Sequence, residues 1–205
     1  MAFEQLASEE SIQKVVDNLK KNGIEAEVVE NGEQAKQEAL SLIPQGAEVF
    51  AYTSETLRQI GVMEEIDESG RYNSVRKQLS ALDRATQARQ MQKLGAAPDY
   101  AIGSVHAITE DGKIFIASNT GSQLPGDAYA AGKVIWVVGT QKIVKDNDQA
   151  LKRIYEHVLP LESVRLNKQY NTNTGSYVSK LLIINREFPA TGRVKVILVK
   201  EKLGF

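Results

Sequence analysis

The sequence predicts a single α/β domain with a largely parallel sheet. Amphipathic helical patterns alternate with short apolar strands along 205 residues, and no repeat, linker or low-complexity tract divides them. Residues 134–138 form a near-continuous apolar run, which is typical of a central parallel strand buried on both faces. We therefore expect one domain over residues 1–205, opened by a helical segment at about residues 1–22.

Helices and strands are expected to alternate through the first half of the chain. Ser8 can cap an opening helix whose apolar residues recur at helical spacing, and Gly23 fits just past its end. The expected elements after it are strands at residues 24–28 and 47–52, an intervening helix stopped by Pro44, and helices from residue 75 to residue 94 with a break near Asp83.

A β-hairpin is expected around Asp111-Gly112. These residues separate two short β-type runs, and both tolerate the positive φ angles that a two-residue type I′ turn needs. In such a hairpin, Glu110 faces Lys113 across the turn and His106 lies near Ala117.

The remaining elements complete the alternation. We expect the final two strands to pair as a hairpin at the edge of the sheet. In order, the elements are a short helix at residues 123–131, the buried strand at 134–138, a helix from Leu151 that Pro160 interrupts, and strands at 181–185 and 194–199.

The composition excludes several classes of function. A formal net charge of -1 lacks the basic field that non-specific nucleic-acid binding requires. The absence of cysteine excludes disulfides, thiolate nucleophiles and iron–sulfur clusters held by this chain through thiolates. No run reaches about 18 apolar residues, so we expect no membrane insertion and a cytoplasmic location. His106 and His157 show no metal-ligand spacing, so we predict no metal site.

Two polar loops are candidate ligand-binding elements because each precedes a predicted helix. Helix N-terminal amides and the carboxyl ends of strands meet at such junctions, where α/β sheets place anionic ligands. The plainer alternative is an ordinary helix cap or surface loop. The first loop contains Thr53, Ser54, Glu55 and Thr56, and the second contains Ser118, Asn119, Thr120, Gly121, Ser122 and Gln123.

Glu110 and His106 are the candidate catalytic residues. A glutamate beside a glycine turn acts as nucleophile or general acid/base when burial raises its pKa. The alternative is a solvated Glu110 that pairs loosely with Lys113, and a His106 that is packed in the strand.

The segment GSVHAITEDGKIFIASNTGSQLPGDAYAAGKVIWVVGTQKIV, together with KLLIINRE and VKVILVKEKLGF, resembles the LUD-domain family, the lactate-utilisation proteins of the C/YkgG type. The matching positions include Thr109, Glu110, Gly112 and the ranges 117–123 and 134–140. The resemblance makes Thr109 a further ligand-binding candidate. The resemblance implies a three-layer α/β/α sandwich with a mostly parallel, Rossmann-like sheet and a β-hairpin. This is the fold of the sugar-phosphate isomerase and CoA-transferase superfamily.

The resemblance also implies a role in organic-acid metabolism. A protein of lactate-utilisation type is expected to bind a small anionic metabolite or a nucleotide-like ligand, and no cofactor is indicated. Two alternatives to this reading remain open. In the first, the protein is a non-catalytic accessory or regulatory subunit of an iron–sulfur lactate-oxidising complex. In the second, it is an enzyme that processes CoA or sugar phosphates. Iron–sulfur subunits and a second copy in a homodimer are the expected partners.

Overall fold

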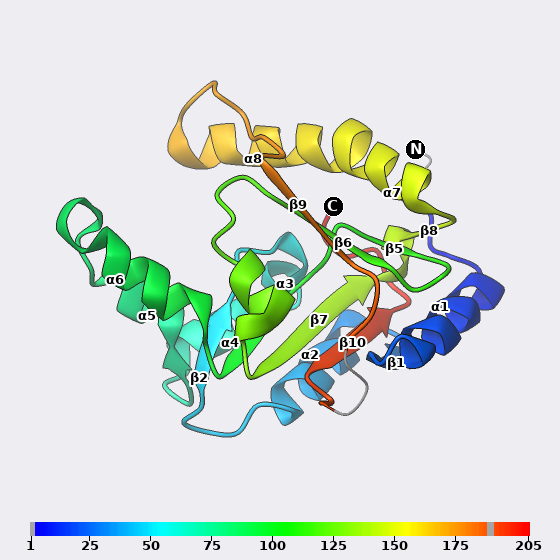
Figure 1. Ribbon diagram of the computed structural model, residues 1–205, viewed down its shortest axis with the longest axis horizontal. Helices are drawn as coiled ribbons and strands as arrows, with labels where there is room; N and C mark the ends of the chain where they lie inside the picture. The colour runs from blue at the N-terminus through cyan, green and yellow to red at the C-terminus, as the bar shows by residue number, and fades with distance from the viewer. Residues whose placement is uncertain (1–2, 188–190) are drawn as a thin grey trace.

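The computed structural model describes residues 3–187 and 191–205, and it contains two stacked sheets with helices on both outer sides (Figure 1). The larger sheet has six strands, and every neighbouring pair runs parallel. In spatial order its strands are β1 (Glu25–Val29), β10 (Val194–Val199), β7 (Lys133–Gly139), β4 (Tyr100–Gly103), β2 (Glu48–Ala51) and β3 (Asn73–Ser74). The predicted α/β fold with a mostly parallel sheet is confirmed.

The smaller sheet has four strands and contains the predicted hairpin. In spatial order its strands are β8 (Ile143–Val144), β5 (Ala107–Thr109), β6 (Ile114–Ser118) and β9 (Lys180–Ile184). The pairs β5/β6 and β6/β9 are antiparallel, whereas β5 and β8 run parallel. This sheet lies between the parallel sheet and the late helices, so it adds a layer on one side (Figure 1).

The expected hairpin between the last two strands is wrong. β9 is an edge strand of the smaller sheet, and β10 lies between β1 and β7 in the parallel sheet. Burial accounts for the difference. Five of the six residues of β10 are buried, as a central parallel strand requires, while β9 leaves Lys180 and Ile183 exposed.

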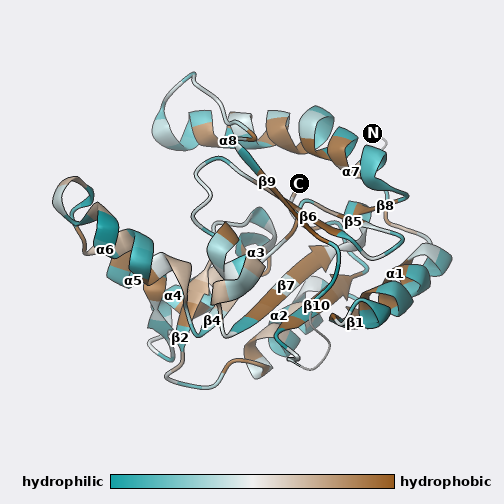
Figure 2. Ribbon diagram, in the orientation of Figure 1, coloured by the Kyte–Doolittle hydropathy of each residue, from teal (hydrophilic) through white to brown (hydrophobic). Residues whose placement is uncertain are grey.

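Helices cover one face of the parallel sheet through small and branched apolar residues. Ala35, Ala39, Leu57 and Ile66 pack there against alternate residues of the central strands. The covering helices are α2 (Gly32–Ser41), α3 (Glu55–Gln59) and α4 (Val62–Glu68). Figure 2 shows the apolar central strands enclosed between polar outer helices.

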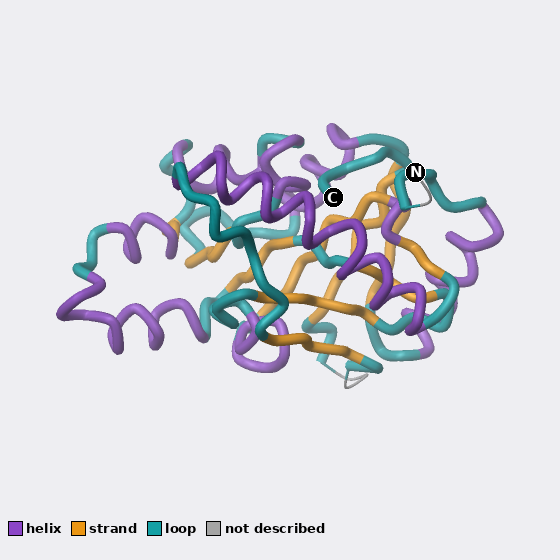
Figure 3. The backbone as a smooth tube through the Cα atoms, turned by 90° about the horizontal axis from the view of Figure 1, so that it is seen from above, coloured by secondary structure: helices purple, strands orange, loops and turns teal. Residues whose placement is uncertain are grey.

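The opposite face packs against α1 (Glu9–Lys21) and the smaller sheet. Ser8 caps α1 as predicted, accepting a hydrogen bond from Ser11 N at 3.2 Å. Two helices, α5 (Val75–Ser80) and α6 (Arg84–Ala96), project from one end of the molecule (Figure 3). Asp83 caps α6, which confirms the predicted break.

The outermost layer is a continuous run of helix beyond the smaller sheet. It consists of α7 (Asn147–Arg153), the π-helical turn η3 (Ile154–Val158) and α8 (Leu159–Tyr170). Pro160 lies in the first turn of α8 and does not interrupt the run, because the wider π turn precedes it. Two short helical turns remain, η1 (Gly126–Ala130) and η2 (Thr140–Lys142).

The hairpin turn is a three-residue loop and not the predicted type I′ turn. Thr109 N donates to Lys113 O at 2.9 Å, and Gly112 N donates to Thr109 O at 2.8 Å. Of the three loop residues, only Gly112 adopts a positive φ, at 81°. A three-residue loop closed by a left-handed glycine needs only one such residue, so Asp111 keeps an ordinary conformation. A Cβ at position 112 would lie 2.9 Å from the Asn18 backbone of α1.

Within the described ranges 3–187 and 191–205, no helix is long and apolar enough to cross a membrane.

Candidate functional site

The carboxyl ends of the parallel strands meet at one edge of the larger sheet, where α/β proteins place their ligands. Thr56 follows β2 in the first turn of α3, and Ser104 follows β4 directly. Lys142 follows β7 in η2, and the segment of residues 200–205 follows β10. Four chain segments that are distant in sequence therefore converge at this edge.

Lys142 lies at the centre of this convergence. The tight turn η2 directs its side chain toward the sheet edge, where Nζ donates to Thr56 Oγ1 and Ser104 Oγ, each at 3.0 Å. The residue is only 4% exposed. Burial, and then the charge of Arg153, lower the pKa of the Lys142 amine to about 7. Both of its hydrogen-bond partners are hydroxyls, so no carboxylate holds the ammonium form.

Arg153 is fully buried at the end of α7 and has no acidic partner among the described residues. Its Nη1 donates to His106 O at 2.8 Å. Nε and Nη2 are buried without any hydrogen-bond partner. Burial lowers the pKa of the guanidinium to about 10, so the group remains charged at neutral pH. The free edge of this guanidinium presents the two parallel N–H groups that bind a carboxylate or phosphate.

His106 is the third basic group of the cluster. Its Nδ1 accepts a hydrogen bond from Ala117 N at 3.1 Å, so the ring hydrogen is on Nε2. Burial, and then the charges of Lys142 and Arg153, lower the pKa of the imidazole to about 3. His106 is therefore neutral at pH 7, and its predicted proximity to Ala117 is confirmed.

We refer to Thr56, Ser104, His106, Lys142 and Arg153 as the Lys142 site. Each basic group lies close enough to the others for their charges to lower its pKa or that of a neighbour. An acid would raise those pKa values, but within residues 3–187 and 191–205 no ion pair involves His106, Lys142 or Arg153. The Lys142 site is therefore a buried region of positive potential suited to an anion.

Segment 200–205 covers the Lys142 site from one side. Leu203 O accepts from Thr56 Oγ1 at 3.2 Å and from Gln141 Nε2 at 2.8 Å. Gly204 N donates to Gln59 Oε1 at 2.7 Å. Gly204 has a positive φ of 68°, and a Cβ there would collide with Thr56 Oγ1.

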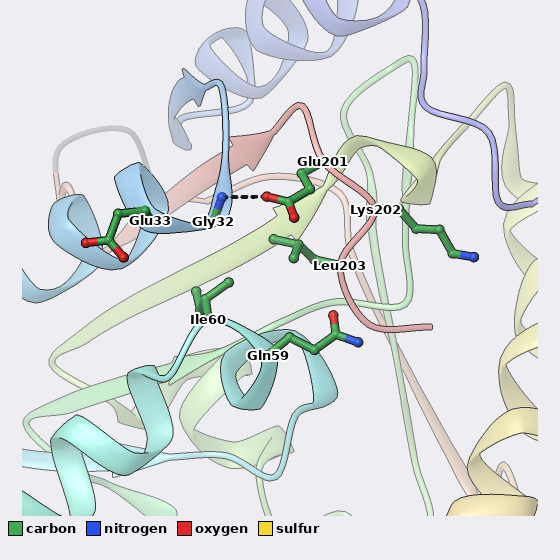
Figure 4. A pocket seen from close by; sticks show the side chains of 7 residues that line it. All are labelled: Gly32, Glu33, Gln59, Ile60, Glu201, Lys202 and Leu203. Carbon is green, nitrogen blue, oxygen red and sulfur yellow. Dashed lines mark hydrogen bonds between the residues drawn. The ribbon is translucent and has the colours of Figure 1, made fainter.

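A hollow of about 430 Å³ lies on the outer side of this segment (Figure 4). Glu201 Oε2 accepts a hydrogen bond from Gly32 N at 2.8 Å. The carboxylate of the protein itself therefore binds the backbone amide at the N-terminus of α2. Figure 4 shows Gln59 and Ile60 closing the opposite wall. The hollow is lined by Gly32, Glu33, Gln59, Ile60, Glu201, Lys202 and Leu203.

The structure brings only part of the first predicted loop into the Lys142 site. Thr56 contacts Lys142, as described above. Ser54 caps α3 by accepting from Leu57 N at 3.3 Å. Glu55 pairs with Arg58 and lies 3.7 Å from Arg165 Nε of α8. Thr53 Oγ1 accepts from Arg76 Nη1 at 3.4 Å.

The second predicted loop follows β6 and makes hydrogen bonds chiefly within itself. Ser118 Oγ accepts from Gly121 N at 2.8 Å and donates to Gln123 Oε1 at 2.9 Å. Thr120 Oγ1 donates to Ser122 Oγ at 3.2 Å, and Asn119 Oδ1 accepts from Ser179 Oγ at 3.4 Å. The loop begins next to Ala117, the hydrogen-bond partner of His106.

Glu110 lies at the opposite end of β5 from His106. Four residue steps along an extended strand separate the two by about 13 Å, so the structure does not bring them together. Glu110 Oε1 accepts from Ser11 Oγ of α1 at 2.5 Å, and Oε2 lies 3.8 Å from Lys14. The predicted contact between Glu110 and Lys113 is wrong.

Lys113 pairs with Asp111 instead, at 2.7 Å. The three-residue loop explains this pairing, because it turns Glu110 toward α1 and away from the partner strand. Thr109 Oγ1 supports the same turn by accepting from Lys113 N at 3.0 Å.

Sequence reasoning missed Lys142, Arg153 and Ser104. Two signals pointed to them. Lys142 and Ser104 each follow closely after a buried parallel strand, which is the position of ligand-binding residues in open α/β sheets. Arg153 is a charged residue on the apolar face of α7, between Ala150 and Ile154. A charge in that position is rare without a partner or a ligand.

Among the residues that the structure describes, no three or more His, Asp or Glu side chains gather in a group that could hold a metal ion.

Comparisons with known proteins agree with this architecture. The structure is similar to that of a DUF162 family protein from Deinococcus radiodurans, with a TM-score of 0.56 and 11% sequence identity, over 95% of this chain and 99% of that one. At this identity the likeness shows a shared fold.

Two further structures have lower similarity. One is eIF2B delta from Chaetomium thermophilum, with a TM-score of 0.40 and 15% identity, over 70% of this chain and 58% of that one. The other is a D-ribose-5-phosphate isomerase in complex with phospho-erythronic acid, with a TM-score of 0.41 and 14% identity, over 85% of this chain and 97% of that one.

No curated protein matches the sequence significantly. The LUD domain matches residues 12–199, which is most of the chain. The protein belongs to the LUD-domain family.

Proposed function

We propose that the protein binds a small anionic metabolite at the Lys142 site and that it acts in organic-acid metabolism. The observation that carries this proposal is the free edge of Arg153, a fully buried guanidinium with two unpartnered N–H groups. A buried charge without a partner costs several kcal/mol, and a bound anion offsets that cost.

The surrounding groups favour a small ligand with one or two acidic groups. Lys142 and Arg153 are both buried, which favours a compact anion over a bulky nucleotide. The charge of Arg153 acts on the Lys142 amine, so a carboxylate or phosphate on Arg153 would lie in the same basic cluster. The family resemblance, which points to lactate-related metabolism, supports an organic acid over an inorganic anion.

Ligand binding to the folded protein is tested by thermal unfolding with pyruvate, lactate, acetate and inorganic phosphate, followed by calorimetric titration. A ligand that binds only the native state raises the unfolding temperature, and the rise grows with the logarithm of its concentration relative to its Kd. Sodium chloride at matched ionic strength controls for screening.

Arg153→Gln tests the site directly, because glutamine keeps a polar side chain but cannot form the charged fork. We expect this variant to lose at least about tenfold in affinity, which is the typical value of a charged hydrogen bond. Arg84→Gln, on the exposed surface of α6, is the matched control and should bind as the wild type does. Equal losses in both variants, or no binding of any acid by the wild type, would refute the proposal.

A further inference from the structure

Lys142 differs from a lysine that only provides positive charge. Its amine is buried and bonded to two hydroxyls, Thr56 Oγ1 and Ser104 Oγ, each at 3.0 Å. Such a lysine is readily deprotonated, because burial penalises its charged form. A pKa of about 7 leaves a substantial fraction of this amine neutral, and therefore nucleophilic, at physiological pH.

The two hydroxyls have different roles around the amine. Thr56 Oγ1 donates its hydrogen to Leu203 O, so toward Lys142 it is an acceptor. Ser104 Oγ accepts a hydrogen bond from Nζ and donates to no other described residue, so its own hydrogen is available to the amine lone pair or to a ligand oxygen. Ser104 can therefore take a proton from Nζ and return one to an oxygen atom beside it.

Arg153 and Lys142 are fixed near each other by one stretch of backbone. Arg153 Nη1 binds His106 O, and Lys142 Nζ binds Ser104 Oγ. Ser104 and His106 are two residues apart, and the charge of Arg153 lowers the pKa of the Lys142 amine, so the two side chains lie within electrostatic reach of each other. A molecule that carries a carboxylate and a carbonyl on adjacent carbon atoms presents the two groups that a guanidinium and an amine would bind.

We propose that Lys142 forms an imine with the carbonyl carbon of a 2-oxo acid whose carboxylate is bound by the free edge of Arg153. This inference rests on the proposed function, since it assigns the substrate class and a covalent step to the same site. Lys142 is then the catalytic nucleophile, and Ser104 is the residue that moves the proton.

The step balances as a condensation. The Nζ lone pair forms a bond to the carbonyl carbon, the carbonyl π electrons move to oxygen, and the nitrogen loses a proton as the oxygen gains one. The carbinolamine hydroxyl then leaves with a second proton as water, and the C=N bond forms. One amine and one ketone give one imine and one water, without any oxidation or reduction.

Reductive trapping tests this step on the full-length wild-type protein. The protein is incubated with pyruvate and sodium cyanoborohydride, digested, and mapped by mass spectrometry. We expect Lys142 to gain the mass of pyruvic acid less one oxygen atom, at least tenfold faster than the exposed Lys145. Lactate has the same carboxylate but no carbonyl, so it should bind without labelling.

Two variants distinguish imine formation at Lys142 from ligand binding at Arg153. Lys142→Arg keeps the positive charge and removes the nucleophile, so it should abolish the label while pyruvate still binds. Arg153→Gln should reduce both binding and labelling. If pyruvate binding depends on Arg153 but Lys142 is labelled no faster than Lys145, the imine proposal is wrong and the proposed function stands. Absence of binding overturns both, and the wild-type peptide map decides the imine even if a variant fails to fold.

Discussion

Lys142 donates a hydrogen bond of 3.0 Å to Thr56, a residue 86 positions away in the sequence. The bond joins the turn after β7 to the first turn of α3, across the carboxyl edge of the parallel sheet. It places a buried amine where four segments of the chain meet, near Arg153, whose Nε and Nη2 are buried without a hydrogen-bond partner.

The pH dependence of labelling at Lys142 should differ from that at an exposed lysine. The basic groups of His106 and Arg153 are near Lys142, and burial lowers the pKa of its amine to about 7. The rate of cyanoborohydride trapping at Lys142 should therefore rise between pH 6 and pH 8. Labelling of the exposed Lys145 should rise only toward pH 10, near the ordinary lysine pKa of about 10.4. Parallel pH profiles for the two residues would contradict the account.

Replacing Arg153 by methionine should cost little stability in the ligand-free protein. The change removes one hydrogen bond to His106 O, but it also removes a buried charge without an acidic partner. We expect the free energy of unfolding in urea to fall by no more than about 1 kcal/mol. Breaking a paired buried charge would cost about 3–5 kcal/mol, so a loss of that size would show that the arginine has a structural role.

His106 should destabilise the protein in acid. Its pKa is about 3 in the folded state and about 6.5 when unfolded, so the unfolded chain binds the extra proton between these values. The stability from His106 is fully present above pH 6.5 and falls by about 1.4 kcal/mol per pH unit as the pH drops toward 3. Relative to wild type, His106→Asn should lose this slope in urea unfolding measured from pH 4 to pH 6.5. An unchanged slope would contradict the account.

Asp127 should destabilise the protein as the pH rises, which is the opposite of the effect of His106, over a similar pH range. Burial raises the pKa of its carboxyl group to about 7, although Trp136 Nε1 donates to it at 3.1 Å. The associated stability is present below about pH 3.8 and is lost as the pH rises to 7. Asn keeps an oxygen for Trp136 without the charge, so Asp127→Asn should be more stable than wild type at pH 8 but not at pH 4. Equal effects at the two pH values would contradict this assignment.

Gly204→Ala should loosen segment 200–205. The residue has a positive φ of 68°, and the added Cβ collides with Thr56 Oγ1. Gly46→Ala is a matched control, since Gly46 has a φ of 80° with nothing within 4 Å of the added atom. Both changes carry the backbone cost of about 1–2 kcal/mol. Only Gly204→Ala should speed amide exchange at residues 203–204, and equal exchange in both variants would show that the segment is not held against Thr56.

Local patterns predicted most of the fold. Ser8, Asp83 and the apolar run at 134–138 identified elements whose formation depends on neighbouring residues and on simple burial. The pairing of β10 was not predicted, because a strand of that composition suits an edge or a centre and only the tertiary arrangement decides between them. The hairpin loop was also not predicted, because the Asp-Gly pair suits both a two-residue and a three-residue loop and the packing of Gly112 against α1 is not visible in the sequence.

Less of the candidate site than of the fold could be predicted from the sequence. Thr56 and His106 were recognised by loop position and residue type, but Lys142 and Arg153 have no motif around them. Their significance depends on burial and on the absence of acidic partners, which appear only when distant segments pack together. Glu110 was predicted to be catalytic because it lies beside a glycine turn. The fold places it against α1, at the far end of β5 from His106.

A crystal structure of the protein with pyruvate would show whether the ligand binds at the free edge of Arg153. We expect carboxylate oxygens within hydrogen-bond distance of both Nε and Nη2 of Arg153, with the adjacent carbon facing Lys142 Nζ. Pyruvate bound elsewhere, with Arg153 Nε and Nη2 contacting only protein groups or water, would contradict this expectation.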